Sequence, residues 1–230
     1  MRISEIFYSI SGEGRNAGIP TVFIRLSGCN LAMNGTPCSY CDSEYAWNPE
    51  DGKELSVKEV VERVQGFKKV GWTLITGGEP LWQIEETEKL TRELKRLGYL
   101  VEVETNGSIA PPKWYRLVDT WSVDIKCPSS SVCGVSKLDA WNRRKQDGLK
   151  FVVGAGEDLQ WTKQVIEGIR LKPAVLISPV AGTLLNKREG TVEEYWNREW
   201  LQECTEFCKV QNVRLSLQVH KIIYGDKRGV

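Results

Sequence analysis

Short runs of apolar residues recur along the chain, and most are rich in β-branched and aromatic side chains. Several of the segments between them place apolar residues about every three or four positions, the period of a helix that faces a core. The runs are mainly continuous rather than alternating in their apolar residues, which is typical of strands buried on both faces in a mostly parallel sheet. We therefore expect strands at 21–26, 72–76, 99–104, 121–125, 149–153, 174–178 and 213–219.

Capping motifs mark where the intervening helices begin. A Ser/Thr-x-x-Glu capping box occurs at 56–59 and again at 191–194. A further helix is expected over 83–97, with leucines on one face and Gly98 placed to end it. The alternation predicts an α/β fold, and the absence of a linker, repeat or low-complexity segment predicts a single domain over 1–230.

Polar motifs stand at the ends of three expected strands: TGGEP at 76–80, ETNG at 104–107 and DIK at 124–126. In parallel α/β sheets ligands bind at the C-terminal ends of the strands. The pattern predicts one functional site at this rim.

The amino-acid composition argues against several classes of protein. Hydrophobic residues make up 41% and charged residues 27%, and no apolar run approaches the roughly 20 residues that span a bilayer. The N-terminal segment does not resemble a secretory signal, so we expect a cytoplasmic protein without a membrane segment. Lys and Arg number 31 against 30 Asp and Glu, so no positive field favours a nucleic-acid partner.

Three of the seven cysteines, Cys29, Cys38 and Cys41, share a loop with the spacing C-x8-C-x2-C directly after the first expected strand. In a reducing compartment an odd number of thiols favours metal binding or catalysis over disulfides. A closed zinc site needs four ligands, whereas the loop offers three and the chain has one histidine, His220. Three thiolates favour an iron–sulfur cluster with one open iron, and structural zinc stays the alternative.

The other four cysteines are expected to have smaller roles. Cys204 and Cys208 lie one turn apart on the apolar stripe of a helix and are expected in the core. Cys127 and Cys133 flank a Ser-rich loop, either as loop residues or as an auxiliary metal site.

The cysteine loop followed by ITGGEPL at 75–81 resembles the radical S-adenosylmethionine superfamily, although the usual cysteine spacing there is C-x3-C-x2-C. Within it, four segments are similar to the 7-carboxy-7-deazaguanine synthase family: SISGEGRNAGIPTVFIRLSGCN, CDSEYAW, VETNGS and LQVHKIIYGDKRGV. The resemblance implies a radical S-adenosylmethionine core, an incomplete β/α barrel of the TIM type, with a modified cluster-binding loop at about 28–55.

The resemblance also implies the reaction. Members are lyases that convert 6-carboxy-5,6,7,8-tetrahydropterin into 7-carboxy-7-deazaguanine with release of ammonia, in queuosine-type or archaeosine-type deazapurine biosynthesis. They use a [4Fe-4S] cluster, S-adenosylmethionine and Mg²⁺, and a 5′-deoxyadenosyl radical abstracts the hydrogen at C6 of the pterin. The implied partners are an external electron donor such as flavodoxin or ferredoxin and a second copy of the chain in a homodimer.

The resemblance also implies roles for individual residues of the site. The cluster ligands are Cys29, Cys38 and Cys41, and the Mg²⁺ ligand is Ser43, where Thr is usual. The implied substrate contacts are Ile10, Ser11, Gly12, Glu13, Arg25, Thr76, His220 and Val230. The implied S-adenosylmethionine contacts are Tyr40, Cys41, Asp42, Gly78, Glu79, Glu104, Asn106, Asp124, Ile125, Lys126 and Ser178.

Physical arguments support some of these assignments and leave others open. Arg25 has the planar guanidinium that grips a carboxylate, and Glu79 offers an acceptor to an ammonium group. His220 either contacts the pterin or satisfies a backbone group. Ser11 stands where Gln is common in the family, and 124–126 where Ser-Pro-Lys is common.

Two other functions remain open on the sequence. An activase that installs a glycyl radical on a partner protein shares the cluster, the GGEP motif and a DIK segment. A zinc- or cluster-bearing binding module is the non-enzyme alternative, but it leaves the polar strand ends unexplained.

Overall fold

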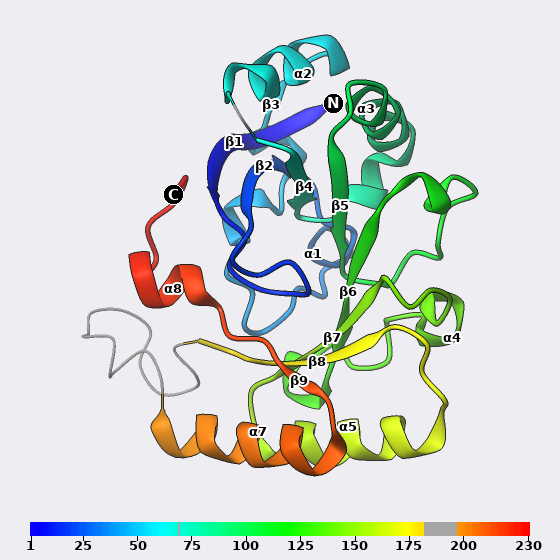
Figure 1. Ribbon diagram of the computed structural model, residues 1–230, viewed down its shortest axis with the longest axis vertical. Coiled ribbons are helices and arrows are strands. Elements are labelled where there is room, and N and C mark those ends of the chain that lie inside the picture. The colour runs from blue at the N-terminus through cyan, green and yellow to red at the C-terminus, as the bar shows by residue number, and fades with distance from the viewer. Residues whose placement is uncertain (69, 182–196) are drawn as a thin grey trace.

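A single sheet organises the computed structural model, which describes residues 1–68, 70–181 and 197–230. Its order in the described residues is β3-β1-β2-β4-β5-β6-β7-β8-β9. The strands are β1 (Arg2–Ile10), β2 (Pro20–Leu26), β3 (Lys53–Glu54), β4 (Trp72–Gly77), β5 (Leu100–Thr105), β6 (Thr120–Lys126), β7 (Gly148–Val153), β8 (Ala174–Pro179) and β9 (Arg214–Leu215). Every pair from β2 to β9 is parallel, whereas β1 runs antiparallel to β2 and β3. The edge strands β3 and β9 are not paired with each other, so the sheet is an open, partial barrel as expected (Figure 1).

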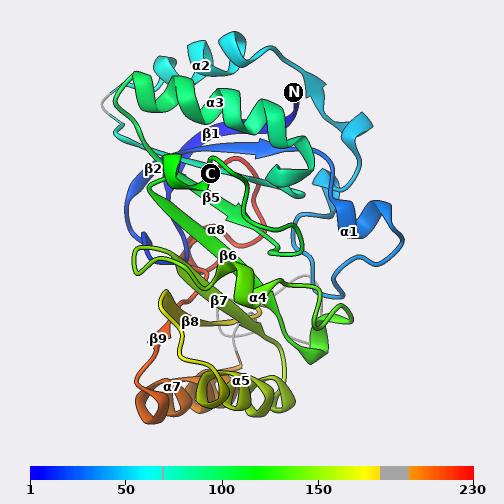
Figure 2. The ribbon, with the colours of Figure 1, turned by 90° about the vertical axis from the view of Figure 1, so that its right-hand side faces the viewer.

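Helices lie at both ends of the sheet. The α-helices are α1 (Asn30–Met33), α2 (Val57–Gly66), α3 (Ile84–Arg96), α4 (Leu138–Trp141), α5 (Gly156–Gly168), α7 (Arg198–Gln211) and α8 (Val219–Tyr224). The short 3-10 turns are η1 (Glu44–Ala46), η2 (Pro49–Asp51), η3 (Pro80–Gln83), η4 (Tyr115–Leu117) and η5 (Pro128–Ser130). Figure 2 shows α2 and α3 together at one end of the molecule and α5 and α7 at the other. None of the helices in the described residues is long and apolar enough to cross a membrane.

Helix α2 begins, and helix α3 ends, at the local sequence signals that predicted them. In the first capping box the Ser56 hydroxyl accepts from the Glu59 N–H at 3.2 Å, and the Glu59 carboxylate accepts from the Ser56 N–H at 2.7 Å. Helix α3 ends at Arg96, and Gly98 adopts a φ of +87°. The second capping box, at 191–194, lies outside the described residues.

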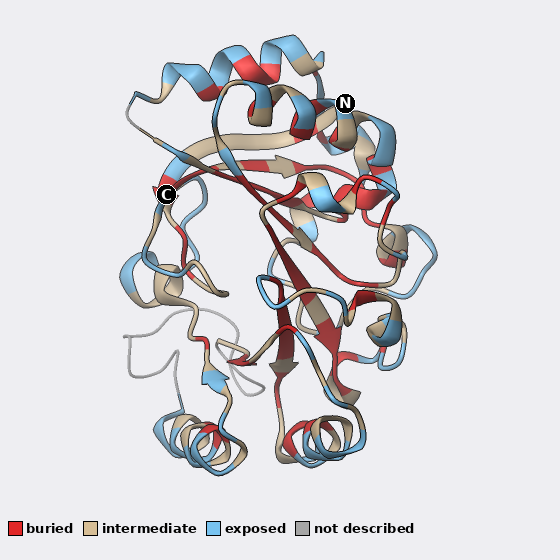
Figure 3. Cartoon of the chain, turned by 45° about the vertical axis from the view of Figure 1, so that its right-hand side comes forward, coloured by how far each residue is buried: buried red, intermediate tan, exposed pale blue. Residues whose placement is uncertain are grey.

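The core lies between the strands and the covering helices, as the buried ribbon in Figure 3 shows. Ile24, Ile75, Val103 and Trp121 are register partners across four strands, and each is fully buried. Burying such a side chain stabilises the fold by about 1.5–3 kcal/mol. The continuous apolar runs of the sequence arise because these strands are covered on both faces.

The two ends of the chain differ from what the sequence pattern indicates. Strand β1, which was not among the expected strands, runs antiparallel beside β2. The expected strand at 213–219 is only Arg214–Leu215, and helix α8 follows it. Strand β9 is an edge strand that pairs over two residues, and the Val219 N–H then donates to the Gly12 carbonyl at 2.8 Å. Residues 218–221 therefore lie at a helix start rather than at a strand end.

Candidate active site

The loop that carries the three cysteines follows β2. Cys29 is buried, Cys38 and Cys41 are half-buried, and all three are free thiols. Cys29 packs with Leu31 and Val132 in a small apolar cluster, against which Cys38 also lies. Burial raises the pKa of the Cys38 thiol, and it raises the pKa of Cys41 to about 11. A positively charged metal group is needed to hold these thiols as thiolates.

Hydrogen bonds fasten this loop to the rest of the site. Its two ends meet where the Gly28 N–H donates to the Ala46 carbonyl at 2.8 Å. Its middle reaches the turn η5 and strand β7, because the Ser39 N–H donates to the Ser130 carbonyl at 3.0 Å and the Tyr40 hydroxyl to the Val152 carbonyl at 3.1 Å. The loop therefore spans the strand ends from β2 to β7.

The turn after β4 requires glycine. Gly77 has a φ of +136°, and a Cβ at Gly78 would lie 2.3 Å from the Gly28 carbonyl oxygen. No side chain fits at either position, because the end of β4 presses against the backbone that leads into the cysteine loop.

Glu79 holds this turn to the next strand. Its carboxylate is fully buried and accepts from the Leu81 N–H at 2.9 Å and the Asn106 N–H at 2.8 Å, and the Thr105 hydroxyl donates to it at 2.9 Å. Burial raises the pKa of Glu79 to about 7 despite these donors. Both oxygens are thus occupied by protein donors, and its contact with an ammonium group stays a prediction.

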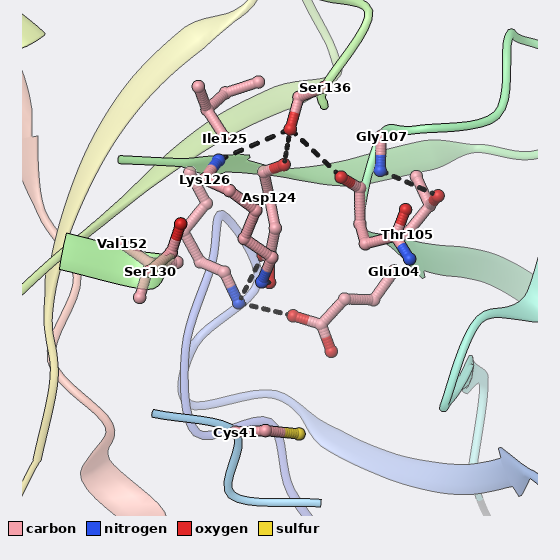
Figure 4. Close-up of polar contacts among 12 residues, drawn as sticks. Cys41, Glu104, Thr105, Gly107, Asp124, Ile125, Lys126, Ser130, Ser136 and Val152 are labelled. Atoms are coloured by element: carbon pink, nitrogen blue, oxygen red, sulfur yellow. Dashed lines mark hydrogen bonds and ion pairs between the residues drawn. The ribbon is translucent and has the colours of Figure 1, made fainter. Parts of the chain in front are cut away.

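Charged side chains from β5, β6 and β7 and from the segment after β1 meet beside the loop. Lys150 Nζ lies 2.5 Å from Glu104, 2.9 Å from Glu13 and 3.0 Å from Asp124. Lys126 Nζ lies 2.9 Å from the other oxygen of Asp124. Figure 4 shows Glu104, Asp124 and Lys126 directed toward one another. We call these five side chains the ionic rim.

The charge of the ionic rim suits a cationic ligand. Burial raises the pKa of Glu104, whereas for Asp124 the lysines Lys126 and Lys150 outweigh burial and lower its pKa. When all five groups are ionised, three carboxylates face two ammonium groups and one negative charge is in excess. A sulfonium or ammonium cation offsets that excess.

A second polar group surrounds Arg25 near the end of β2. Its Nε donates to Glu5 at 2.8 Å, and its Nη1 lies 3.3 Å from the Ser43 hydroxyl. The Tyr45 hydroxyl donates to the same Glu5 oxygen at 3.1 Å. Thr76, the register partner of Arg25, donates to Glu104 at 2.9 Å and so links this group to the ionic rim.

The C-terminal segment covers the opposite side of the site. A Cβ on Gly12 would lie 2.1 Å from the His220 ring, so these two residues are in direct contact. Lys221 Nζ lies 3.4 Å from Asp42, and the Arg228 guanidinium lies 3.4 Å above the ring centroid of Tyr45. The last residues of the chain thus return to the polar group formed by Arg25, Glu5, Ser43 and Tyr45, which we call the Arg25 group.

Comparisons with known proteins agree with this geometry. Residues 23–128 match the model of the radical SAM superfamily. The chain is 37% identical to a 7-carboxy-7-deazaguanine synthase of Methanospirillum hungatei, over 97% of this chain and 85% of that protein. The chain belongs to the 7-carboxy-7-deazaguanine synthase family.

One further relative and one solved structure are similar to this chain along nearly their whole length. The chain is 34% identical to a 7-carboxy-7-deazaguanine synthase of Leptospira interrogans, over 99% of this chain and 97% of that protein. The crystal structure of QueE from Escherichia coli has a TM-score of 0.67 at 22% identity and covers 95% of this chain and 94% of that chain. At that identity the structural likeness supports the fold alone.

Membership of the radical SAM superfamily brings a [4Fe-4S] cluster and S-adenosylmethionine, and the synthase family adds Mg²⁺. The donor set fits the cluster: three free thiols share one loop, and Cys38 packs against the apolar cluster that contains Cys29. Within the described residues no three Cys, His, Asp or Glu side chains gather closely enough for a single metal ion. A cluster would be held by the thiolates of Cys29, Cys38 and Cys41.

Most residues that the resemblance implies lie around this site. The structure joins Thr76 to Glu104, Arg25 to Ser43, Gly12 to His220 and Asp124 to Lys126. The side chain of Ile125 is instead part of the core, and Ser178 is buried on β8 beside Val152, the residue whose carbonyl binds Tyr40. The contacts expected of Ile10, Ser11 and Val230 stay predictions.

Cys204 and Cys208 are buried, as expected. Cys127 is buried with its thiol 3.6 Å from the Ile125 carbonyl, whereas Cys133 is exposed.

Four residues in or beneath the site were not predicted from the sequence. Lys150 is central to the ionic rim, Glu5 orients Arg25, and Trp47 contacts the cysteine loop. Glu102 is buried one layer below Glu104, and burial raises its pKa to about 7. An ionisable residue within an otherwise apolar strand was the available signal for Lys150 and Glu102, since such a residue is rarely buried without a partner.

Proposed function

We propose that this chain catalyses the ring contraction of 6-carboxy-5,6,7,8-tetrahydropterin to 7-carboxy-7-deazaguanine and ammonia, in a deazapurine pathway. The observation that supports it is the convergence of cysteine loop, glycine turn and ionic rim at one edge of the sheet, in a chain similar to named synthases along nearly its whole length. Substrate and products contain the same atoms, so the reaction consumes no net oxidant. The relatives favour neither the activase nor the zinc module.

The cofactors supply the radical chemistry: when bound, the cluster delivers an electron to S-adenosylmethionine, which then provides the hydrogen-abstracting group. Cys29, Cys38 and Cys41 would hold the cluster. The excess negative charge of the ionic rim would bind the cationic cofactor beside the loop. Tyr40, fixed by the Val152 carbonyl, would limit where the cofactor lies.

Binding of the substrate falls to the Arg25 group. Glu5 occupies the Nε of Arg25, which leaves the end of the guanidinium directed toward Ser43. A carboxylate on the pterin would bind there in a charge-assisted contact. Glu13 and the His220–Gly12 contact would close the other side.

The Ser43 hydroxyl would ligate Mg²⁺ together with substrate oxygens and water. Mg²⁺ retains several waters in proteins and needs few protein ligands, so one hydroxyl is sufficient. Ser43 donates to Asp42 at 3.1 Å, and this carboxylate would strengthen the cation site.

The decisive experiment uses the full chain, reconstituted anaerobically with iron and sulfide. With dithionite, S-adenosylmethionine, Mg²⁺ and 6-carboxytetrahydropterin, we expect a brown protein that forms 7-carboxy-7-deazaguanine and ammonia in equal amounts. Cleavage of S-adenosylmethionine without that product would favour the activase instead. A colourless protein that binds zinc would exclude both enzyme functions.

We further propose that residues 1–230 form one cytoplasmic domain that works as a homodimer and accepts electrons from flavodoxin or ferredoxin. Light scattering of the reconstituted protein should give twice the chain mass, and a monomer would contradict the dimer. Replacing dithionite with reduced flavodoxin should sustain product formation. If it does not, ferredoxin is the donor to test.

A further inference from the structure

Trp47 contacts both ends of the cysteine loop. Its backbone carbonyl accepts from the Cys29 N–H at 2.9 Å, and its indole Nε1–H donates to the sulfur of Cys41 at 3.2 Å. One residue thus fixes the backbone of the first cysteine and the sulfur of the last. The hydroxyls of Ser39 and Tyr40, in the same loop, instead donate to the carbonyl oxygens of Ser129 and Val152.

The surroundings of Trp47 hold its ring in place. The Trp47 N–H donates to the Glu44 carbonyl at 3.1 Å and so ends the turn η1. The ring is half-buried and packs against the apolar cluster of Cys29, Leu31 and Val132. The packing on one side and the backbone hydrogen bonds on the other limit the directions in which the indole N–H can point.

We propose that Trp47 is a positioning residue, which holds Cys41 as a cluster ligand and makes the cluster easier to reduce through its N–H···S hydrogen bond. Reduction adds negative charge that spreads onto the sulfur ligands, and an N–H dipole aimed at one of them stabilises that charge. The inference rests on the proposed function, because it requires that the cluster is present.

A purely structural role for Trp47 makes a different prediction. If the ring only fills space beside Leu31 and Val132, an aromatic residue of the same size without the N–H should serve equally well. The hydrogen bond and the packing can therefore be separated by removing one nitrogen.

The experiment compares reconstituted wild-type protein with a Trp47→Phe variant and with a protein that carries 3-benzothienylalanine at position 47. The latter keeps the size of the indole and replaces its N–H by sulfur. Iron content and the midpoint potential of the cluster are measured by redox titration followed by electron paramagnetic resonance. Pulsed measurements in D₂O report whether an exchangeable proton couples to the reduced cluster.

A Trp141→Phe variant is the matched control. The Trp141 indole also donates a hydrogen bond, at 3.0 Å to the Ile109 carbonyl, but Trp141 is buried on α4 away from the cysteine loop. Its loss should lower the stability of the protein and leave the cluster potential unchanged.

In both proteins altered at position 47 we expect the midpoint potential of the cluster to shift to more negative values and the coupling to the exchangeable proton to be lost. Loss of iron from the benzothienylalanine protein would support the inference as well, because that protein lacks only the N–H. Full iron content with an unchanged potential in that protein would overturn the inference while leaving the proposed function intact. A wild-type protein that assembles no cluster would overturn both, and this outcome is recognised before any variant is made.

Discussion

The cysteine loop and the ionic rim lie side by side but are built in different ways. The loop is held by backbone hydrogen bonds and by an apolar cluster, and its three thiols lie within a dozen residues of one another in sequence. The ionic rim joins Glu13, Glu104, Asp124 and Lys150, which lie on separate segments of the chain. A local motif can specify the first region, whereas only the register of the sheet brings the second together.

The largest effect is expected from removing a thiol of the loop. Cys38→Ala should reduce formation of 7-carboxy-7-deazaguanine to the background rate, because a cluster held by two thiolates is not retained. Iron content and product yield after reconstitution measure this loss. Cys133→Ala is the control, since that thiol is exposed and outside the loop. Equal iron loss in both variants would assign Cys133 to a metal site as well.

A substitution in the ionic rim should lower the stability of the protein rather than its iron content. Lys150→Met leaves Glu13, Glu104 and Asp124 without their shared cation, at a cost of about 3–5 kcal/mol in the free energy of unfolding. Without the Lys150 cation the pKa of the buried Glu104 rises further, so the deficit should shrink as the pH falls. Urea unfolding at two pH values tests this. Lys145→Met, at an exposed position on the preceding loop, should be near neutral.

A smaller effect is expected one layer below the rim, at Glu102. Burial raises its pKa from 4.5 to about 7 in the folded protein. The stabilisation is therefore complete below the unfolded pKa and is lost as the pH rises through about 7. Between about pH 5 and pH 8 the wild-type protein should lose on the order of 2 kcal/mol relative to Glu102→Gln, which stays neutral. Parallel pH profiles of unfolding free energy would contradict this.

Substitutions of Ser43 test the proposed Mg²⁺ site, which lies where the cysteine loop meets the Arg25 group. Ser43→Ala should weaken stimulation of the reaction by Mg²⁺ about tenfold, because one of few protein ligands is lost. Ser43→Thr retains the hydroxyl and should behave like the wild type. The measurement is product formation as a function of Mg²⁺ concentration. An unchanged response in Ser43→Ala would remove the metal role from this residue.

The smallest effect concerns the hydrogen bonds that join the first turn of the loop to the end of β5. Asn30 donates to Ser108 at 2.9 Å and accepts from Asn106 at 3.0 Å. Asn30→Ala should cost about 1 kcal/mol in unfolding free energy, and its effect should not add to that of Asn106→Ala. Asn48→Ala, at an exposed position without a capping hydrogen bond, is the control. Fully additive effects would show that the two regions are not coupled.

Much of the fold could be predicted because its signals are local. The capping box at Ser56, the stop at Gly98 and the continuous apolar strands depend on neighbouring residues, and the structure confirms each. The strand expected at 213–219 was wrong because β9 is an edge strand that ends where the Gly12 carbonyl binds the Val219 N–H. No local pattern reports a contact between residues so far apart in the chain.

The sequence by itself determined the chemistry of this protein: three thiols in one loop, a glycine turn that leaves no room for side chains, and polar residues at strand ends. The tertiary structure decided which charges meet. Lys150 meets its three carboxylates only after the parallel strands are aligned, and Glu5 meets Arg25 through the antiparallel register of β1 and β2. Trp47 reaches the sulfur of Cys41 when the loop folds back on itself. The reason is physical, because a buried charge or donor is stabilised by whichever partner lies within a few ångströms of it, and folding sets that distance.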